Sequence, residues 1–379
     1  MEKRYLFTPG PTPVPPQVLA ALAEPVLHHR GPDFKVVYAR CLERLKTVCR
    51  TERDVLLFTS SGTGLLESAV ANLVSPADRV LSVSAGYFGE RWAELARTYG
   101  ADVDELRYDW GEAPAAADVE ARLDGHSLVL LTHSETSTGV VADIQALAAV
   151  ARDAGALVAV DAISSLGAVP LETDAWGLDV VVSGSQKALM TPPGLALVTV
   201  SEAAWGRRGS APRFYFDWER TQSAQEQLDA AFTPATSLVV ALDVALGLLL
   251  EGGLDAAFER HVRLGRACRA GARAMGLELF SPDDDSAAVV TAIKAPEGVD
   301  SGELVLTLRD RFGITLAPGQ GPLKGKVFRI GHIGWFDVFD IATALGGVEL
   351  ALTEAGAEIE RGVAVTAAFE AFAEPVRVA

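Results

Sequence analysis

The sequence predicts an α/β protein with a mostly parallel central sheet flanked by helices. Short apolar runs at residues 55–58, 79–84, 127–133, 157–161 and 179–184 are separated by segments of helical periodicity. Their apolarity is continuous rather than alternating, which is typical of strands buried on both faces of a parallel sheet. Strands of this kind that alternate with helices indicate a doubly wound architecture.

The segments around these strands predict an extended arm, further helices and one more strand. Residues 4–16 contain five prolines and cannot form a helix, because proline lacks the backbone donor. From Asp33, apolar residues recur at three- and four-residue spacing and predict a helix with one buried face. Residues 143–155 are expected to form another helix, and residues 195–200 a further strand.

A change of pattern divides the chain into domains. A long apolar helix ends at the glycine pair 252–253, so we expect a domain boundary there. We therefore expect an N-terminal arm at 1–20, a large domain at 21–252 and a smaller C-terminal α+β domain at 253–379. The strands expected in the smaller domain are 287–294 and 327–334, and the helices are 301–313 and 337–354.

Composition limits the classes of protein that fit. The chain has 379 residues, 49% of them hydrophobic, which is enough for a substantial buried core. Its 33 Lys and Arg are scattered among 50 Asp and Glu, and the net charge of -17 argues against a nucleic-acid partner. No leader and no membrane-spanning run is visible, so we expect a cytoplasmic protein without membrane contact.

The number and placement of the cysteines predict reduced thiols rather than disulfides. Cys41, Cys49 and Cys268 are too few for a disulfide framework and lie in helix-like surroundings. We expect them to be core thiols. No spacing of metal ligands stands out in the sequence, and we expect no metal site.

Polar residues at the carboxyl ends of parallel strands are the candidates for function, because ligands bind beyond those ends. The strand at 55–58 leads into TSSGTGLLESAV, where Ser61, Gly62 and Thr63 can hold a phosphate at a helix N-terminus. The same residues would equally serve as a turn and a helix cap. The glycine spacing matches neither a dinucleotide fingerprint nor a P-loop, which disfavours a nicotinamide-dependent dehydrogenase.

Two ionisable residues follow two further strands. Asp161 ends the apolar run 157–161, where it would either cap a helix or stabilise a protonated ring nitrogen of a cofactor. Lys187 follows the run 179–184 by three residues. It would either be a solvated loop residue or, if desolvated, a nucleophile towards aldehydes because its proton affinity falls.

Six motifs carry a resemblance to a known family. They are TPGPTPVPP, SSGTG, GYFGERW, THSETSTG, SGSQKALMTPPG and FRIGHIG. Together they resemble the class V aminotransferases, in particular the alanine-glyoxylate, serine-glyoxylate and serine-pyruvate enzymes. SGSQKALMTPPG is the most specific motif, and the resemblance covers nearly the whole chain. It implies the fold type I of PLP-dependent transferases, with pyridoxal 5'-phosphate (PLP) as cofactor.

The resemblance also implies roles for residues of the cofactor site. Lys187 would carry the cofactor as a Schiff base, and Asp161 would partner the pyridine nitrogen. Ser137 would donate to the ring hydroxyl. Phe88 would stack on the ring, where members of the family commonly have Trp. The phosphate contacts would come from Ser61, Gly62, Thr63 and Gln186.

For the substrate, the resemblance implies that Arg329 receives the carboxylate and that Gly10 lies beside it. Thr233 would reach the phosphate of a partner subunit, which implies a homodimer with active sites at the interface. Beyond Arg329, nothing in the sequence marks a second charged group that would receive an acidic side chain of the donor. We therefore expect a small amino donor, serine or alanine, and glyoxylate or pyruvate as acceptor.

Two alternatives to an aminotransferase are considered. A PLP-dependent lyase of the cysteine desulfurase type needs a mobile cysteine near the loop 317–325, and no cysteine lies there. A non-catalytic binding or regulatory protein on the same fold is disfavoured by the presence of Lys187, Asp161 and Arg329. The particular donor, acceptor and pathway stay open.

Overall fold

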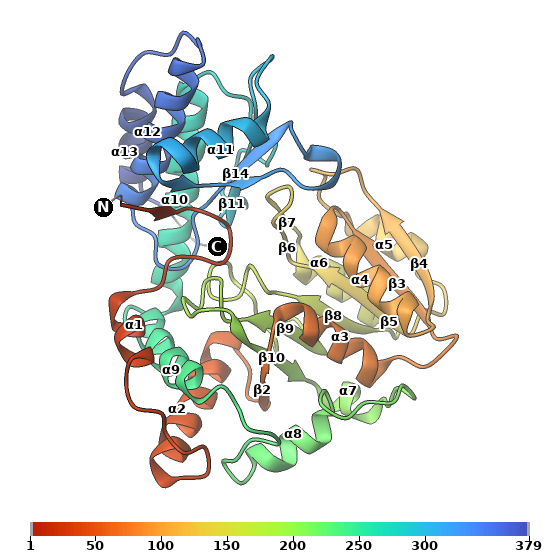
Figure 1. Ribbon diagram of the computed structural model, residues 1–379. Coiled ribbons are helices and arrows are strands. Elements are labelled where there is room, and N and C mark those ends of the chain that lie inside the picture. The colour runs from red at the N-terminus through yellow and green to blue at the C-terminus, as the bar shows by residue number, and fades with distance from the viewer. Residues whose placement is uncertain (1–2, 377–379) are drawn as a thin grey trace.

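A seven-stranded sheet forms the centre of the computed structural model, which describes residues 3–376 (Figure 1). Its strand order is β2-β10-β9-β8-β5-β3-β4. Only β10 runs antiparallel to its neighbours, so the expected mostly parallel sheet is confirmed. In chain order, the strands are β2 (Val55–Ser60), β3 (Arg79–Ser84), β4 (Asp102–Arg107), β5 (Leu128–Thr132), β8 (Leu157–Asp161), β9 (Val180–Gly184) and β10 (Gly194–Val200).

The sheet is buried on both faces, as the continuous apolar runs predict. Val55 and Leu57 pack into one hydrophobic cluster, whereas Leu56 and Phe58 pack into another on the opposite face. The expected strands all form. The edge strand β4, with the polar sequence DVDELR, was not expected because it lacks an apolar run.

Helices cover both faces of this sheet (Figure 1). One face carries α3 (Gly62–Leu73) and α4 (Tyr87–Thr98), whose buried side chains join the cluster of Leu56 and Phe58. The helices α2 (Pro32–Cys49), α6 (Ile144–Asp153) and α9 (Thr236–Leu250) supply the other cluster. The shorter helices of this unit are α1 (Pro16–Leu22), α5 (Ala116–Arg122), α7 (Glu202–Gly206) and α8 (Trp218–Gln225).

A smaller α+β unit follows, and Figure 1 shows it above the main sheet. Its sheet has the order β11-β14-β13, from strands β11 (Val290–Lys294), β13 (Ala317–Pro318) and β14 (Val327–Gly331). The expected strands and helices form, and one helix, α13, was not expected. The helices are α10 (Leu254–Ala274), α11 (Ser301–Phe312), α12 (Val338–Glu354) and α13 (Val363–Ala373). The domain limits at 20 and 252 stay predictions.

The N-terminal arm connects the two units. Its strand β1 (Tyr5–Leu6) pairs in parallel with β12 (Ile314–Thr315), and Phe7 lies in the hydrophobic cluster of the smaller unit. Figure 1 shows the arm passing between the units before α1. The backbone oxygen of Phe7 accepts from Gly331 N at 2.8 Å, and Thr12 N donates to Gln186 O at 3.2 Å. The extended arm is thus fixed to both units at the place where they meet.

The apolar helix α9 belongs to the core of the larger unit. Its one buried carboxylate, Asp243, accepts from Arg44 Nη1 at 2.7 Å and also pairs with Arg40, both on α2. No single described helix is long and apolar enough to cross a membrane; α9 and α10 meet that test only as a pair bent by 82°.

Candidate functional site

A pocket of about 280 Å³ opens at the carboxyl ends of the central strands, where the N-terminal arm crosses them. Eight residues predicted from the sequence line it, which places them together as expected. The lining residues are Gly10, Pro11, Ser61, Gly62, Thr63, Leu66, Phe88, Arg91, Ser134, Asp161, Ile163, Ser164, Gln186, Lys187 and Pro193. Three predicted residues do not line it: Ser137, Thr233 and Arg329.

Lys187 lies in the turn after β9 and is 9% exposed. Its Nζ donates to the backbone oxygen of Pro9 at 2.7 Å. Burial and, to a smaller extent, the neighbouring Arg329 charge lower the pKa of Lys187 to about 8, although Asp161 and Glu135 act in the opposite direction. More of the amine is therefore unprotonated near neutral pH than in an ordinary lysine, as a nucleophile requires.

Gly10 allows the arm to approach this lysine. A Cβ at this position would lie 2.4 Å from Lys187 Cδ and Cε, and 2.6 Å from Nζ. The φ of Gly10 is +143°, a conformation that L side chains rarely adopt. Only glycine therefore fits here without displacing the lysine, which explains this residue of the TPGPTP motif.

Asp161 ends β8 and is 5% exposed. Its Oδ1 accepts from Ile163 N at 2.9 Å. Burial raises the pKa of Asp161 to about 7, and the nearby Glu135 charge also raises it, whereas the Ile163 hydrogen bond and Lys187 lower it. A protonated ring nitrogen in the pocket would restore the ionised carboxylate, so this placement suits the predicted role.

The predicted phosphate cradle lies at the N-terminus of α3. Ser61 is the N-cap, and its hydroxyl accepts from Gly64 N at 3.2 Å. Gly62 allows a close approach of Ile163, because a Cβ there would lie 2.5 Å from Ile163 Cδ1. The first two backbone N–H groups of the helix, those of Gly62 and Thr63, have no partner within the helix and could bind an anion, and its dipole favours negative charge.

Glu135 is a buried carboxylate that the sequence reasoning missed. It lies in the short strand β6 (Ser134–Glu135) and is 2% exposed. Its Oε2 accepts from Phe88 N at 2.9 Å and Gly89 N at 3.2 Å. Burial raises the pKa of Glu135, and these hydrogen bonds oppose the rise. Glu135 thereby fixes the start of α4 and with it Phe88. The signal available in the sequence was an acidic residue among the hydroxyl-bearing residues of the SETSTG segment.

Ser137 lies behind the pocket wall rather than on it. Its Oγ donates to Glu135 Oε1 at 2.5 Å and accepts from Tyr87 N at 3.2 Å. In this arrangement the hydroxyl supports Glu135 and α4. The hydroxyl of the same segment that does line the pocket is Ser134, whose buried Oγ has no hydrogen-bond partner among residues 3–376. The role of Ser137 towards a ring hydroxyl stays a prediction.

Arg329 on β14 is 5% exposed and has no carboxylate within 4.0 Å among the described residues. Its Nη1 donates to Thr136 O at 2.7 Å, whereas Nε and Nη2 donate to Pro318 O at 3.2 and 2.8 Å. Burial lowers the pKa of Arg329 to about 10, which leaves it charged at neutral pH. One N–H on each terminal nitrogen stays available to an acid.

Arg91 on α4 also lines the pocket, and the sequence reasoning missed it. Its position three residues after Phe88, on the same helical face, was the available signal. Thr233 is exposed in the loop before α9, and its role towards a partner subunit stays a prediction.

The pocket fits PLP in the kind of group that it offers. The N-terminus of α3 suits the phosphate, and the apolar Phe88 side chain suits the face of the ring. The Asp161 carboxylate suits the ring nitrogen, and the Lys187 amine suits the aldehyde. Two buried polar atoms in its wall, Ser134 Oγ and Gln186 Oε1, have no partner within residues 3–376. Such unsatisfied atoms are expected where a polar ligand binds.

The described cysteines lie away from this pocket. Cys41 and Cys49 are buried in α2, and Cys268 is buried in α10, all as free thiols. Burial raises the pKa of Cys49 to about 12, so its thiolate is disfavoured. Within residues 3–376, no group of three or more His, Cys, Asp or Glu side chains is placed to hold a metal ion.

Comparisons with known proteins agree on the family and the fold. The family model for Aminotransferase class-V matches residues 4–324. A serine–glyoxylate aminotransferase of Methylorubrum extorquens is 35% identical, over 97% of this chain and 95% of its own. A protein of a Synechococcus strain, named soluble hydrogenase small subunit, is 41% identical over 94% of each chain. The crystal structure of ureidoglycine-glyoxylate aminotransferase from Bacillus subtilis has a TM-score of 0.93 at 32% identity, with 99% of each chain covered.

The close approach of the arm predicts the effect of Gly10→Ala. The added methyl group would collide with Lys187 and strain the backbone, at a cost of about 1–3 kcal/mol. We expect a lower free energy of unfolding in urea and at least about tenfold weaker PLP binding. Gly252→Ala is the control, because its nearest neighbour would be Ala256 Cβ at 3.5 Å. Equal behaviour of the two variants would contradict the steric argument.

The contacts of Glu135 predict the effect of Glu135→Gln. The amide nitrogen cannot accept from the backbone, so the N–H groups of Phe88 and Gly89 or those of Ser137 lose an acceptor. We expect the free energy of unfolding to fall by about 1–3 kcal/mol. Glu112→Gln, at an exposed carboxylate, should change it by less than about 0.5 kcal/mol. A Glu135→Gln variant as stable as this control would refute the positioning role.

Proposed function

This chain belongs to the class-V aminotransferases, and we propose that it moves an amino group from serine or alanine to glyoxylate or pyruvate. The activity is that of a PLP-dependent transaminase. The single observation that carries the substrate class is the buried guanidinium of Arg329, which has free N–H groups and no acidic partner among residues 3–376. Such a charge is stabilised by a ligand carboxylate, because an unpaired buried charge is costly.

The wall near Lys187 supports a small donor. Gly10 and Pro11 line the pocket there, and the arm comes so close that one added methyl group at Gly10 would meet the lysine. An amino acid whose carboxylate reaches Arg329 and whose Cα lies near Lys187 therefore has room for only a short side chain. Serine and alanine meet this condition, and a 2-oxo acid of the same size does as well.

The cofactor supplies an aldehyde and an electron-withdrawing ring that stabilises negative charge at the substrate Cα. Lys187 would hold the aldehyde, and its Nζ would move the Cα proton of the substrate. Asp161 would keep a proton at the ring nitrogen, and Phe88 would cover the ring face. Arg329 orients the substrate through its carboxylate. The backbone of the arm, which accepts from Lys187 Nζ through Pro9, keeps the amine in position.

The name of the Synechococcus relative suggests another activity, and no described residue favours it for this chain. Redox metals in hydrogen chemistry favour soft thiolate ligands. The three cysteines of this chain are buried in α2 and α10 as separate free thiols. The residues gathered in the pocket instead serve an aldehyde, a phosphate and a carboxylate.

The test of the proposed function is to mix the purified PLP-bound protein with single amino acids and no acceptor. We expect serine and alanine to bleach the visible absorbance of the bound cofactor and to release one equivalent of their keto acids. Lys187→Ala should show neither change, because no other amine lines the pocket among the described residues. Lys294→Ala, at an exposed lysine of β11, should behave as the unaltered protein does. Unchanged spectra with both donors would overturn the proposal.

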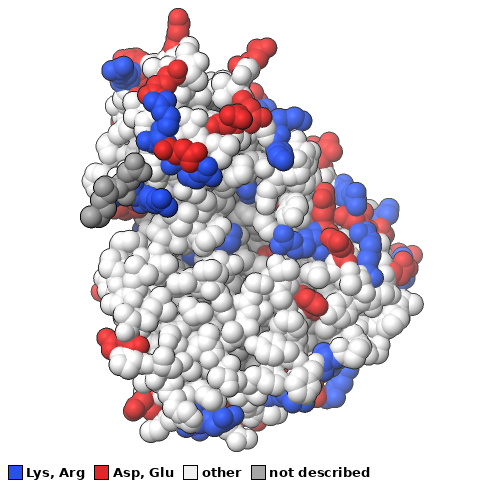
Figure 2. All heavy atoms as spheres, viewed as in Figure 1, with Lys and Arg blue, Asp and Glu red and all other residues white. Residues whose placement is uncertain are grey.

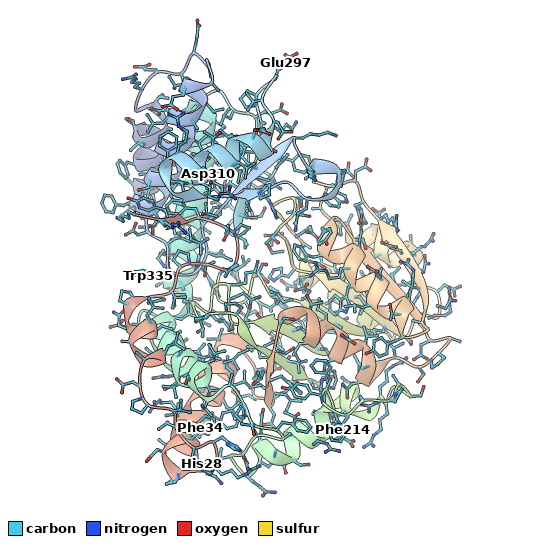
Figure 3. All side chains as sticks on the ribbon, in the orientation of Figure 1. His28, Phe34, Phe214, Glu297, Asp310 and Trp335 are labelled. Atoms are coloured by element: carbon cyan, nitrogen blue, oxygen red, sulfur yellow. The ribbon has the colours of Figure 1, made fainter. Side chains whose placement is uncertain are left out.

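We also propose that the protein is a homodimer with its sites at the interface. The exposed large apolar side chains of the larger unit include Val26, Phe214 and Tyr215, and the lower part of the face in Figure 2 carries few charges. Phe214, beside α8, is 65% exposed, and Figure 3 shows it at the edge of this unit. Its ring packs on Phe232, one residue before Thr233. Burial of such a surface favours association.

The dimer is tested by Phe214→Glu. A carboxylate in a buried interface is costly, so we expect the dissociation constant from sedimentation to rise by about tenfold or more. Phe339→Glu, in the smaller unit, is the control because Phe339 is 67% exposed and lies on α12. A monomeric unaltered protein, or equal behaviour of both variants, would contradict the proposed interface.

A further inference from the structure

The guanidinium of Arg91 is a second cation in the pocket wall besides Lys187. It is half-buried, and its Nη1 donates to Thr63 Oγ1 at 3.1 Å, beside the N-terminus of α3. No acidic side chain lies within 4.0 Å of it in the described part of the chain. Arginines of this protein generally have such partners: Arg97, on the same helix, pairs with Glu105 at 2.6 Å. Arg91 is thus a charge without an internal counterion.

Two aromatic rings hold Arg91 in place without neutralising it. Its guanidinium carbon lies 5.0 Å from the ring centroids of both Tyr87 and Phe88. The two rings meet edge to face, with centroids 5.4 Å apart. Cation–π contacts orient the plane of a guanidinium but leave its N–H groups open to hydrogen bonds. Most of the donors of Arg91 are therefore available to a ligand.

The neighbours of Arg91 are also donors. Thr63 lies in the first turn of α3, where backbone N–H groups lack partners within the helix. In the same pocket, Ser134 is 5% exposed and its buried Oγ has no partner within residues 3–376. A guanidinium, a helix N-terminus and an unsatisfied hydroxyl in one pocket call for an acceptor with several oxygens and more than one negative charge. A phosphate monoester has both properties.

We propose that Arg91 binds the cofactor phosphate and supplies the fixed positive charge of its subsite, an inference that rests on the proposed function. The rival ligand is the distal carboxylate of a dicarboxylic amino donor. The two arginines act on different parts of the pocket: Arg329 lowers the pKa of Lys187, whereas Arg91 lowers that of Asp161. The contact of Arg91 with Thr63 places it at the phosphate cradle and favours phosphate.

The experiment compares PLP with pyridoxal, which lacks the phosphate, on the apoprotein. Arg91→Gln keeps a polar side chain of similar reach and removes the charge. We expect it to weaken PLP binding by about tenfold or more, the effect of losing a charge-assisted hydrogen bond, and pyridoxal binding by less than about twofold. Arg91→Lys should recover part of the loss. Arg97→Gln, on the exposed side of α4, should alter neither dissociation constant.

Other results would overturn the inference. An equal loss of PLP and pyridoxal affinity in Arg91→Gln would mean that Arg91 only supports the two aromatic rings. Unchanged PLP affinity with a raised KM for aspartate alone would assign the charge to a substrate carboxylate.

Failure of the proposed function would look different, because it would show as unchanged spectra with serine and alanine and would leave the PLP and pyridoxal dissociation constants of each variant measurable. If the unaltered protein bound neither PLP nor pyridoxal, the anion site would need another probe. Calorimetry with inorganic phosphate would then test whether Arg91 forms an anion site. Phosphate binding to the unaltered protein but not to Arg91→Gln would support the anion site, and equal or absent binding in both would overturn it.

Discussion

The site depends on one constraint, the burial of four ionisable groups that are not paired with one another. Lys187, Arg329, Asp161 and Glu135 are each 9% exposed or less, and no two of them lie within 4.0 Å as an ion pair in the described chain. Burial shifts the pKa of each towards its neutral form. Backbone groups satisfy them instead, and these partners hold the side chains but do not cancel their charge. A ligand group of opposite charge can then neutralise a buried group that has no ionic partner.

The fold supplies those backbone partners from segments that are distant in the sequence. The arm brings the oxygen of Pro9 to Lys187, and the turn after β6 brings the oxygen of Thr136 to Arg329. Phe7 packs in the smaller unit while Thr12 bonds the Lys187 turn, so the arm sets the position of β14 relative to β9. Arg329 and Lys187 thus keep a fixed relative geometry, because one continuous segment of the chain, the N-terminal arm, contacts both units.

Because the partners of these side chains come from segments that are distant in the sequence, only part of the site could be predicted from the sequence. Apolar runs located the buried strands. Asp161 was found because it ends such a run, and Lys187 because it follows one by three residues. The polar edge strand β4 gave no such signal. Glu135, Arg91 and the orientation of Ser137 depend on contacts across the fold, which no local pattern contains. Family resemblance named Ser137 by its position in a motif, whereas only the packed structure shows that its hydroxyl is bound to Glu135.

The pocket contains cationic side chains that are unpaired within residues 3–376, although the chain has a net charge of -17. Figure 2 shows acidic side chains mostly on the smaller unit and along one edge, away from the lower part of that face. At physiological ionic strength, exposed charges act over about 8 Å, whereas buried charges are screened much less. Lys187, Arg91 and Arg329 therefore dominate the local field at the cofactor and the substrate. The net charge of the surface thus does not set the charge of the pocket, which depends on the few cations that lack an acidic partner in the described chain.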